Sequence, residues 1–310
     1  MNIQIPLSLL PSLLFMALCL VPPLAIICIF KQQTKRKKSP LNISLLRNPG
    51  QSLREQIEDE TIEIITSLLL IPAASILLYS IIITEYVSSG HKINLISSLI
   101  YLFAIVGGVS YLITKVFRMI KHRNHLRLGY DCELAVGQEL SNRIRDGFFV
   151  FHDFPADGFN IDHVLVGSTG VFAIETKGRA KLRVAENENW KMEYNGKKLK
   201  FPGWTETKPI EQAKNQAQWL SQWLQKTTGS PCKVSPVLAI PGWWINRIAS
   251  GDMPVYNGKD SSFLVKGQAV LSPPHIKAIA HQVDQKCRTV ESSSYKQEDK
   301  DKKKLVFTSE

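Results

Sequence analysis

The sequence predicts an α/β or α+β domain that follows three transmembrane helices. Two observations carry this prediction. The first is a set of three long, uncharged, apolar runs within residues 1–129. The second is the order helix, strands, helix, strand, strand, helix over residues 130–288, which is typical of a layered domain with one core. Residues 289–310 are polar and mixed in charge, and we expect them to be a disordered tail.

The three apolar runs cover about residues 5–30, 64–84 and 93–114. A helix needs ~20 apolar residues to cross the hydrocarbon core of a bilayer, and each run is long enough. Buried helices of soluble proteins seldom lack charge over such a length, which favours membrane spans for the second and third runs. The first run is also expected to be a span, with a cleaved signal peptide as the alternative.

Basic residues flank these runs unevenly. Residues 31–38 and 115–127 each hold five Lys and Arg, whereas the loop 85–92 holds one. The positive-inside rule therefore places the N-terminus outside and the segment 31–63, with everything after residue 115, in the cytoplasm. Within this segment, residues 51–63 are expected to form a short helix that leads into the second span. The prediction is a multi-pass protein of the bacterial cytoplasmic membrane with a cytoplasmic C-terminal domain. A transporter or channel would be a rival, but the spans contain no charged residue to support it.

The net charge of +11 first suggests a nucleic-acid partner, but most of it lies in the membrane part. Residues 1–129 carry +7 and the domain 130–288 carries only +4, yet residues 177–200 alone carry +5. With 44% hydrophobic residues and 5 Cys, the chain is neither disordered overall nor a disulfide-framed miniprotein. A solvated surface is the alternative to our hypothesis that this basic stretch contacts phosphates. The candidate contacts are Lys181, Arg183, Lys197, Lys198 and Lys200.

The domain's elements follow from its apolar periodicity and its turn residues. Helices are expected at 130–145, at 209–225 after a Pro suited to a first helical turn, and from Ser272 to about Cys287. Gly-containing turns predict a hairpin between the strands 161–166 and 171–176, and a second hairpin at Asn195-Gly196. Further strands are expected at 148–152, 182–184, 190–194, 198–201, 237–240 and 262–265.

The first hairpin collects the distinctive polar residues. Asp162 opens one strand and Glu175 ends the next, so the two carboxylates should meet across the pair. Lys177 lies two residues after Glu175 and should share its face. Two carboxylates and an ammonium suit metal-assisted phosphodiester hydrolysis with Mg²⁺ or Mn²⁺, although a salt bridge at a strand end is the alternative for the triplet alone. His163 should face the other way, as a packed histidine, with a role as a general base as the alternative. Trp204 could stack on a nucleobase.

Several stretches around these residues resemble the nuclease-related domain family (NERD), a branch of the PD-(D/E)XK nuclease superfamily. The resemblance implies a restriction-endonuclease-like core, with a mixed sheet flanked by helices. The matching stretches are Glu133-x-x-Val136 with Leu140, Phe159–Gly167, Gly170–Lys177 and Pro209–Ala213, within residues 130–245. The resemblance implies that Asp162 and Glu175 bind the metal and that Lys177 assists the attacking water. It also implies supporting roles for a helix glutamate and for Gln212. The family's helix glutamate usually follows Gly, whereas Glu133 follows Cys132 and Glu139 follows Gln138, so both remain candidates, with Glu133 preferred for its downstream spacing.

The sequence thus predicts a membrane-anchored, Mg²⁺-dependent or Mn²⁺-dependent nuclease, with DNA favoured over RNA as its substrate but RNA left open. Its expected partners are nucleic acid and the lipid bilayer, and its protein partners are unknown. The alternative is a catalytically inactive nuclease fold that serves as a membrane-tethered module for binding nucleic acid or protein.

Overall fold

The computed structural model describes residues 21–22, 25–26, 28–29, 40–41, 43–90, 95–181 and 190–291. These residues fall into two compact units. The helical unit contains residues 58–90 and 95–123, and the sheet unit contains residues 43–57, 124–181 and 190–290. Residues 51–63 were expected to form a short helix that leads into the second span. They are the beginning of one longer helix, α2 (Gln51–Ser88), and residues 43–57 belong to the sheet unit.

The helical unit is made of most of α2 (Gln51–Ser88) and the first part of α3 (Leu95–Ser141). Both helices are long and apolar enough to cross a membrane, by length and composition. They contain the second and third of the predicted spans. The first predicted span, 5–30, lies almost wholly outside the described residues, so two candidate helices are found where three spans were predicted.

The sheet unit is built on a mixed five-stranded sheet in the order β10-β8-β4-β3-β2. Within this sheet β2, β3 and β4 pair antiparallel, and β4, β8 and β10 run parallel, as the helix between β4 and β8 permits. This arrangement confirms the predicted mixed sheet flanked by helices. The strands are β2 (Phe149–Pro155), β3 (Asn160–Gly167), β4 (Gly170–Thr176), β8 (Val234–Ala239) and β10 (Val255–Tyr256).

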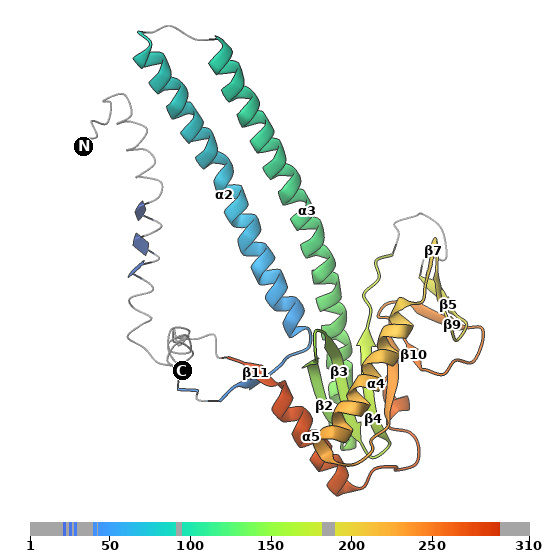
Figure 1. Ribbon diagram of the computed structural model, residues 1–310. Coiled ribbons are helices and arrows are strands. Elements are labelled where there is room, and N and C mark those ends of the chain that lie inside the picture. The colour runs from blue at the N-terminus through green and yellow to red at the C-terminus, as the bar shows by residue number, and fades with distance from the viewer. Residues whose placement is uncertain are drawn as a thin grey trace. The chain divides into compact units, whose positions relative to one another are not determined.

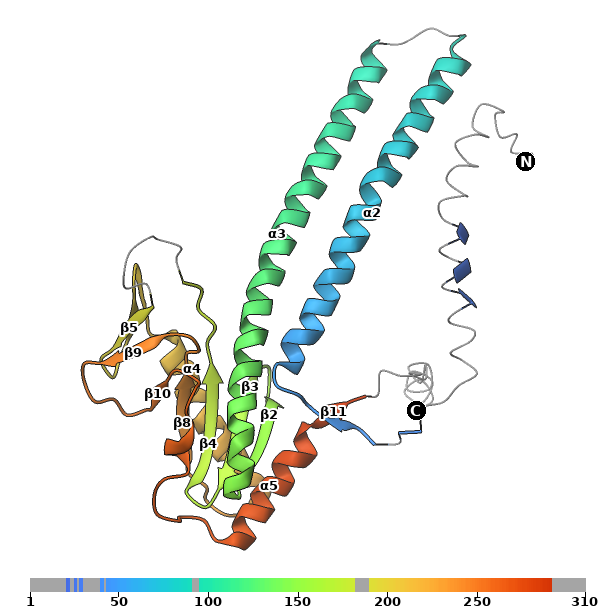
Figure 2. The same cartoon turned by 180° about the vertical axis from the view of Figure 1, so that it is seen from behind.

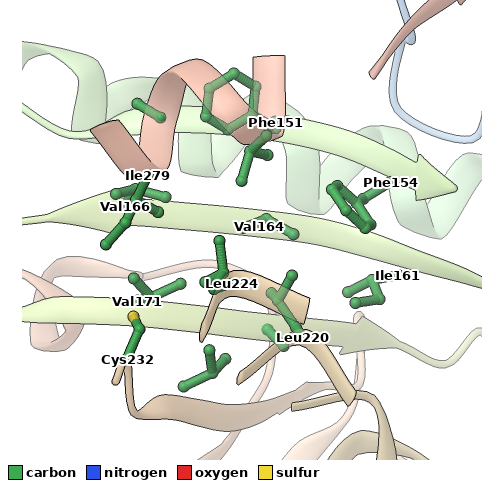
Figure 3. Packing of buried hydrophobic residues seen from close by; sticks show 14 of the residues in the cluster. Phe151, Phe154, Ile161, Val164, Val166, Val171, Leu220, Leu224, Cys232 and Ile279 are labelled. Atoms are coloured by element: carbon green, nitrogen blue, oxygen red, sulfur yellow. The ribbon is translucent and has the colours of Figure 1, made fainter. Parts of the chain in front are cut away.

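Helices cover both faces of this sheet (Figures 1 and 2). On one face, α4 (Lys208–Thr228) and α5 (Pro273–Cys287) enclose the largest apolar cluster, in which Leu220, Leu224 and Ile279 meet the strands (Figure 3). On the other face, Val136 and Leu140 of α3 pack against Leu165, Ile174 and Val237. The sheet is therefore buried on both sides, which explains its nearly continuous apolar strands.

A second, smaller sheet has the order β7-β6-β5-β9. One of its faces buries Met192, Leu199 and Phe201 against Ile210 and Ala213 of α4. The predicted Asn195-Gly196 turn is confirmed, because Asn195 Oδ1 accepts hydrogen bonds from the backbone N–H groups of Lys197 and Lys198, at 3.1 and 2.9 Å. The strands are β5 (Lys191–Tyr194), β6 (Leu199–Phe201), β7 (Trp204–Glu206) and β9 (Trp244–Arg247).

Three sequence predictions about elements were wrong. The helix expected to start at residue 130 is the last part of α3, which is continuous from Leu95 to Ser141. The strand expected at 262–265 is the 3₁₀ helix η3 (Ser262–Leu264), because Asp260 Oδ1 accepts the N–H of Ser262 at 2.8 Å and starts a turn. Residues 289 and 290, expected in the tail, belong to β11 (Arg288–Val290), which pairs antiparallel with β1 (Leu45–Leu46). The part of the expected tail after residue 291 lies outside the described residues. The strand expected at 182–184 lies outside the described residues.

Candidate functional site

The β3–β4 hairpin brings the two predicted carboxylates together. His163 pairs with Ile174 and the turn is formed by residues 168–169, so Asp162 lies next to the end of β4. The backbone N–H of Thr176 donates a hydrogen bond to Asp162 Oδ2 at 2.6 Å. The predicted hairpin register is therefore confirmed, while the chemical role of the two carboxylates stays a prediction.

Lys177 lies on the same side as Glu175. Its ammonium forms an ion pair with Glu175 Oε1, and its backbone N–H donates to the carbonyl of Ala239 at 2.9 Å. Glu175 is 1% exposed, whereas Lys177 is 24% exposed. The second carboxylate oxygen of Glu175 is buried and has no hydrogen-bond partner. A buried carboxylate oxygen without a partner costs free energy of folding, so a cation or a hydrogen-bond donor bound at this oxygen of Glu175 would be stabilising.

Helix α3 adds a third carboxylate, from Glu133. Burial, followed by the charges of Asp153 and Glu175, raises the pKa of Glu133 to about 8. Burial, with the charges of Glu175 and Glu133, raises the pKa of Asp162 well above its ordinary value. The charge of Lys177 acts in the opposite direction on both groups. Glu133, Asp162, Glu175 and Lys177 thus form one electrostatic cluster, which we call the carboxylate cluster.

The alternative helix glutamate is engaged elsewhere. Glu139 Oε1 accepts hydrogen bonds from the N–H and the hydroxyl of Ser261, at 3.3 and 3.1 Å. Glu139 Oε2 accepts another from Asn142 Nδ2 at 3.2 Å. Of the two candidates, Glu133 is therefore the one that the fold places beside Asp162 and Glu175.

Two glutamines of α4 differ in their surroundings. Gln212 is exposed, whereas Gln216, one turn later, is buried. Gln216 Nε2 donates to the carbonyl of Asn160 at 3.1 Å, two residues before Asp162, and its Oε1 atom is buried without a partner. Gln216 thus contacts the start of β3. The supporting role of Gln212, which is exposed one turn earlier, stays a prediction.

Sequence reasoning missed a network behind the cluster. Asp153 has a positive φ of 48° and lies buried on β2, and its Oδ2 atom accepts hydrogen bonds from Arg47 and Ser52. The donors are Arg47 Nε at 2.8 Å, Arg47 Nη2 at 2.5 Å, the Ser52 N–H at 2.8 Å and the Ser52 hydroxyl at 2.7 Å. Ser52 lies in the first turn of α2, so a carboxylate from a distant strand satisfies a free N–H of that helix.

His163 is packed away from the cluster, as predicted. It is fully buried and faces His152 on β2, with the two Nδ1 atoms 2.9 Å apart. Burial lowers the pKa of both rings, that of His152 to about 4. Both imidazoles are therefore neutral near pH 7, and one Nδ1–H donates to the other Nδ1.

Acid is expected to destabilise the sheet unit through His152. The folded pKa is about 4 and the unfolded value near 6.5, so over this interval only the unfolded chain binds the proton. The contribution of His152 to the free energy of unfolding is thus fully present above pH ~6.5 and is lost as the pH falls toward 4. Urea unfolding followed by tryptophan fluorescence reports this unit, because all six Trp lie in residues 190–244. His152→Gln should reduce the loss per pH unit, and equal slopes in wild type and variant would contradict the explanation.

The residues present fit a divalent cation. Crowded carboxylates and an unpartnered carboxylate oxygen are the hard ligands that Mg²⁺ and Mn²⁺ prefer. Mg²⁺ usually takes one or two protein carboxylates and completes its shell with water and substrate phosphate. Among the described residues, no three His, Cys, Asp or Glu side chains are arranged to hold a metal ion by themselves. Asp162 and Glu175 are the pair that would hold such an ion.

The basic residues proposed for phosphate contact are only partly grouped. Lys197 and Lys198 are exposed in the β5–β6 turn, and Lys200 forms an exposed ion pair with Glu193 at 3.0 Å. The ammonium of Lys181 lies 5.7 Å from the centre of the Trp243 ring. Arg183 lies outside the described residues.

Comparison with protein-family models matches residues 128–241 to the nuclease-related domain, NERD. This match begins in α3, ends after β8 and includes all four residues of the carboxylate cluster. It supports the resemblance to the nuclease-related family over a little more than a third of the chain. No curated protein and no solved structure matches the chain.

Proposed function

We propose that this chain is a membrane-anchored nuclease that hydrolyses phosphodiester bonds of nucleic acid with Mg²⁺ or Mn²⁺, on the cytoplasmic side of the membrane. The observation that carries the proposal is the carboxylate cluster, with its unpartnered Glu175 oxygen, inside the segment that matches the nuclease-related domain. The two long apolar helices support the membrane anchor.

Each residue of the cluster would have a distinct task. Asp162 and Glu175 would hold the ion, which when bound polarises a phosphate oxygen and lowers the pKa of a bound water. Lys177, held by its ion pair with Glu175, would orient the attacking water and stabilise negative charge that develops on the phosphate. Glu133 would support the two ligands from α3, and Gln216 would hold the start of β3 through Asn160.

The test is cleavage by the full chain in detergent micelles, with single-stranded and double-stranded DNA and RNA. Cleavage is expected with Mg²⁺ or Mn²⁺, to be abolished by a chelator, and to be lost in Glu175→Gln. Glu211→Gln, an exposed carboxylate in the first turn of α4, is the matched control and should cleave like the wild type. If wild-type protein cleaves none of the four substrates with either ion, the inactive binding module is the better description.

The exposed lysines of the β5–β6 turn are expected to contact phosphates. Lys197→Glu combined with Lys198→Glu should weaken nucleic-acid binding and flatten the dependence of log affinity on log salt, by about 0.7–0.9 for each phosphate that the variant no longer neutralises. Fluorescence anisotropy over a salt series measures both quantities. The control is Lys226→Glu combined with Lys233→Glu, which changes two exposed lysines that precede β8 in the sequence. An unchanged affinity and slope in the turn variant would leave the turn as an ordinary solvated surface.

A further inference from the structure

Two tryptophans are exposed on the small sheet. Trp190 is 43% exposed and Trp244 is 59% exposed. Their ring centres are 5.9 Å apart and the ring planes meet at 80°. The backbone N–H of Trp244 donates a hydrogen bond to the backbone carbonyl of Trp190 at 2.8 Å. The other four tryptophans are buried or partly buried. Trp204, which the sequence offered as a stacking residue, lies flat on Phe201 at 4.6 Å and belongs to the core of this sheet.

The tryptophan pair lies beside an open, basic face. Strand pairing places Lys191 opposite Trp244, and Glu193 opposite both Lys200 and Asn246, on the face that does not contact α4. The ammonium of Lys191 lies 5.1 Å from the centre of the Trp190 ring. Residues 190–207 and 243–250 contain five cations and two carboxylates, and both carboxylates are in ion pairs with cations. Exposed aromatic rings among excess cations suit a polyanion that carries flat bases.

The small sheet contacts the segment that follows the carboxylate cluster in the sequence. Two residues after Lys177, Arg179 forms a bidentate ion pair with Glu206 of β7, at 2.8 and 2.9 Å. The indole N–H of Trp243 donates to the carbonyl of Arg179 at 3.0 Å. Figure 1 shows β5, β7 and β9 beyond the end of β4, where Glu175 and Lys177 lie. The segment that follows Lys177 is therefore held against the sheet that carries Trp190 and Trp244.

We propose that Trp190 and Trp244 form a subsite for unpaired bases, so that the nucleic acid bound by this chain is single-stranded or locally opened. The proposal rests on the proposed function, in that it names the class of substrate at the same site. Each base within a duplex is covered by its neighbours, and only an unpaired base offers a face to an aromatic ring. Lys191 and Lys200 would contact the phosphates of the bound strand.

Binding without cleavage tests this subsite. The full chain in micelles is titrated with a labelled single-stranded oligonucleotide, and separately with the duplex of the same length, in the presence of a chelator. Trp244→Ala should lower single-strand affinity roughly 5- to 100-fold and duplex affinity much less. Because stacking releases no counterions, the salt dependence should keep its slope, in contrast to the lysine variants of the β5–β6 turn. Trp244→Phe should keep most of the affinity.

Ile248→Ala is the matched control, because Ile248 is 58% exposed on the same edge and its N–H bonds to the carbonyl of Tyr194. The proposal is overturned if Trp244→Ala binds single strands as wild type does, or loses duplex and single-strand affinity equally. It is also overturned if the variant loses only binding to anionic lipid vesicles, which would make the pair a membrane contact. Since these measurements need no cleavage, an inactive wild type would contradict the proposed hydrolysis while leaving the subsite result standing.

Discussion

Lys177→Met is expected to lower the rate of phosphodiester cleavage by about 10²–10³ while the chain still binds nucleic acid and Mn²⁺. The ammonium of Lys177 is the cation that faces Glu175 and opposes the raised pKa values of Glu133 and Asp162. Methionine keeps the length and apolar stem of the side chain but removes this charge and its donors. Single-turnover cleavage at saturating enzyme separates the chemical step from substrate binding.

A metal-binding measurement distinguishes the roles within the cluster. Removing a cation beside the ligands should leave Mn²⁺ affinity equal or higher in Lys177→Met, whereas Asp162→Asn should lower it, because the ion then has one carboxylate fewer. Lys214→Met is the control, since the ion pair of Lys214 with Asp252 is exposed on the surface. Wild-type cleavage rates in Lys177→Met would remove Lys177 from the reaction.

Asp153→Ala is expected to destabilise the sheet unit by about 3 kcal/mol, the usual cost of removing one partner from a buried ion pair. The Arg47 and Asp153 side chains are only 13% and 4% exposed, and Asp153 also accepts two hydrogen bonds from Ser52. The substitution leaves a largely buried guanidinium without its anionic partner and a helix N–H without its acceptor. The midpoint of urea unfolding, followed by tryptophan fluorescence, measures the effect.

The control for this prediction is Asp252→Ala, which breaks an exposed ion pair and should leave the midpoint unchanged. Asp153→Asn should fall between wild type and Asp153→Ala, because Asn tolerates the positive φ and keeps an acceptor oxygen. Adding Arg47→Met should restore part of the stability that Asp153→Ala removes, since the stranded charge is then absent. If Asp153→Ala, Asp153→Asn and the double variant with Arg47→Met are all as stable as wild type, the network contributes little to the free energy of unfolding.

The parts of the site that the sequence predicts are those set by local rules. The two-residue turn of the β3–β4 hairpin fixes the register, and a register fixes which residues meet, so Asp162 and Glu175 follow directly. The spacing of two residues puts Lys177 with Glu175. The Asn195-Gly196 turn is a similarly short-range signal.

The parts that the sequence does not predict depend on distant contacts. Arg47 and Asp153 are 106 residues apart, and neither has a neighbour in the sequence that indicates the other. The apolar run of α3 ends near residue 114, but no proline interrupts residues 115–141, so the helix continues although the composition changes. The exposure of Trp190 and Trp244, against the packing of Trp204, depends on which face of the small sheet contacts α4.

The pairing of β1 with β11 has a consequence for the synthesis of the chain. Leu45 of β1 pairs with Val290 of β11. Strand β1 is therefore synthesised early, whereas its partner β11 is synthesised only after the apolar helices and the central sheet. At ~5–20 residues per second, the interval is on the order of ten to fifty seconds. During this time the backbone groups of Leu45 and Leu46 have no strand partner, and the guanidinium of Arg47 cannot yet donate its hydrogen bond to the hydroxyl of Thr289. Translation of the last described residues therefore completes the attachment of the first strand.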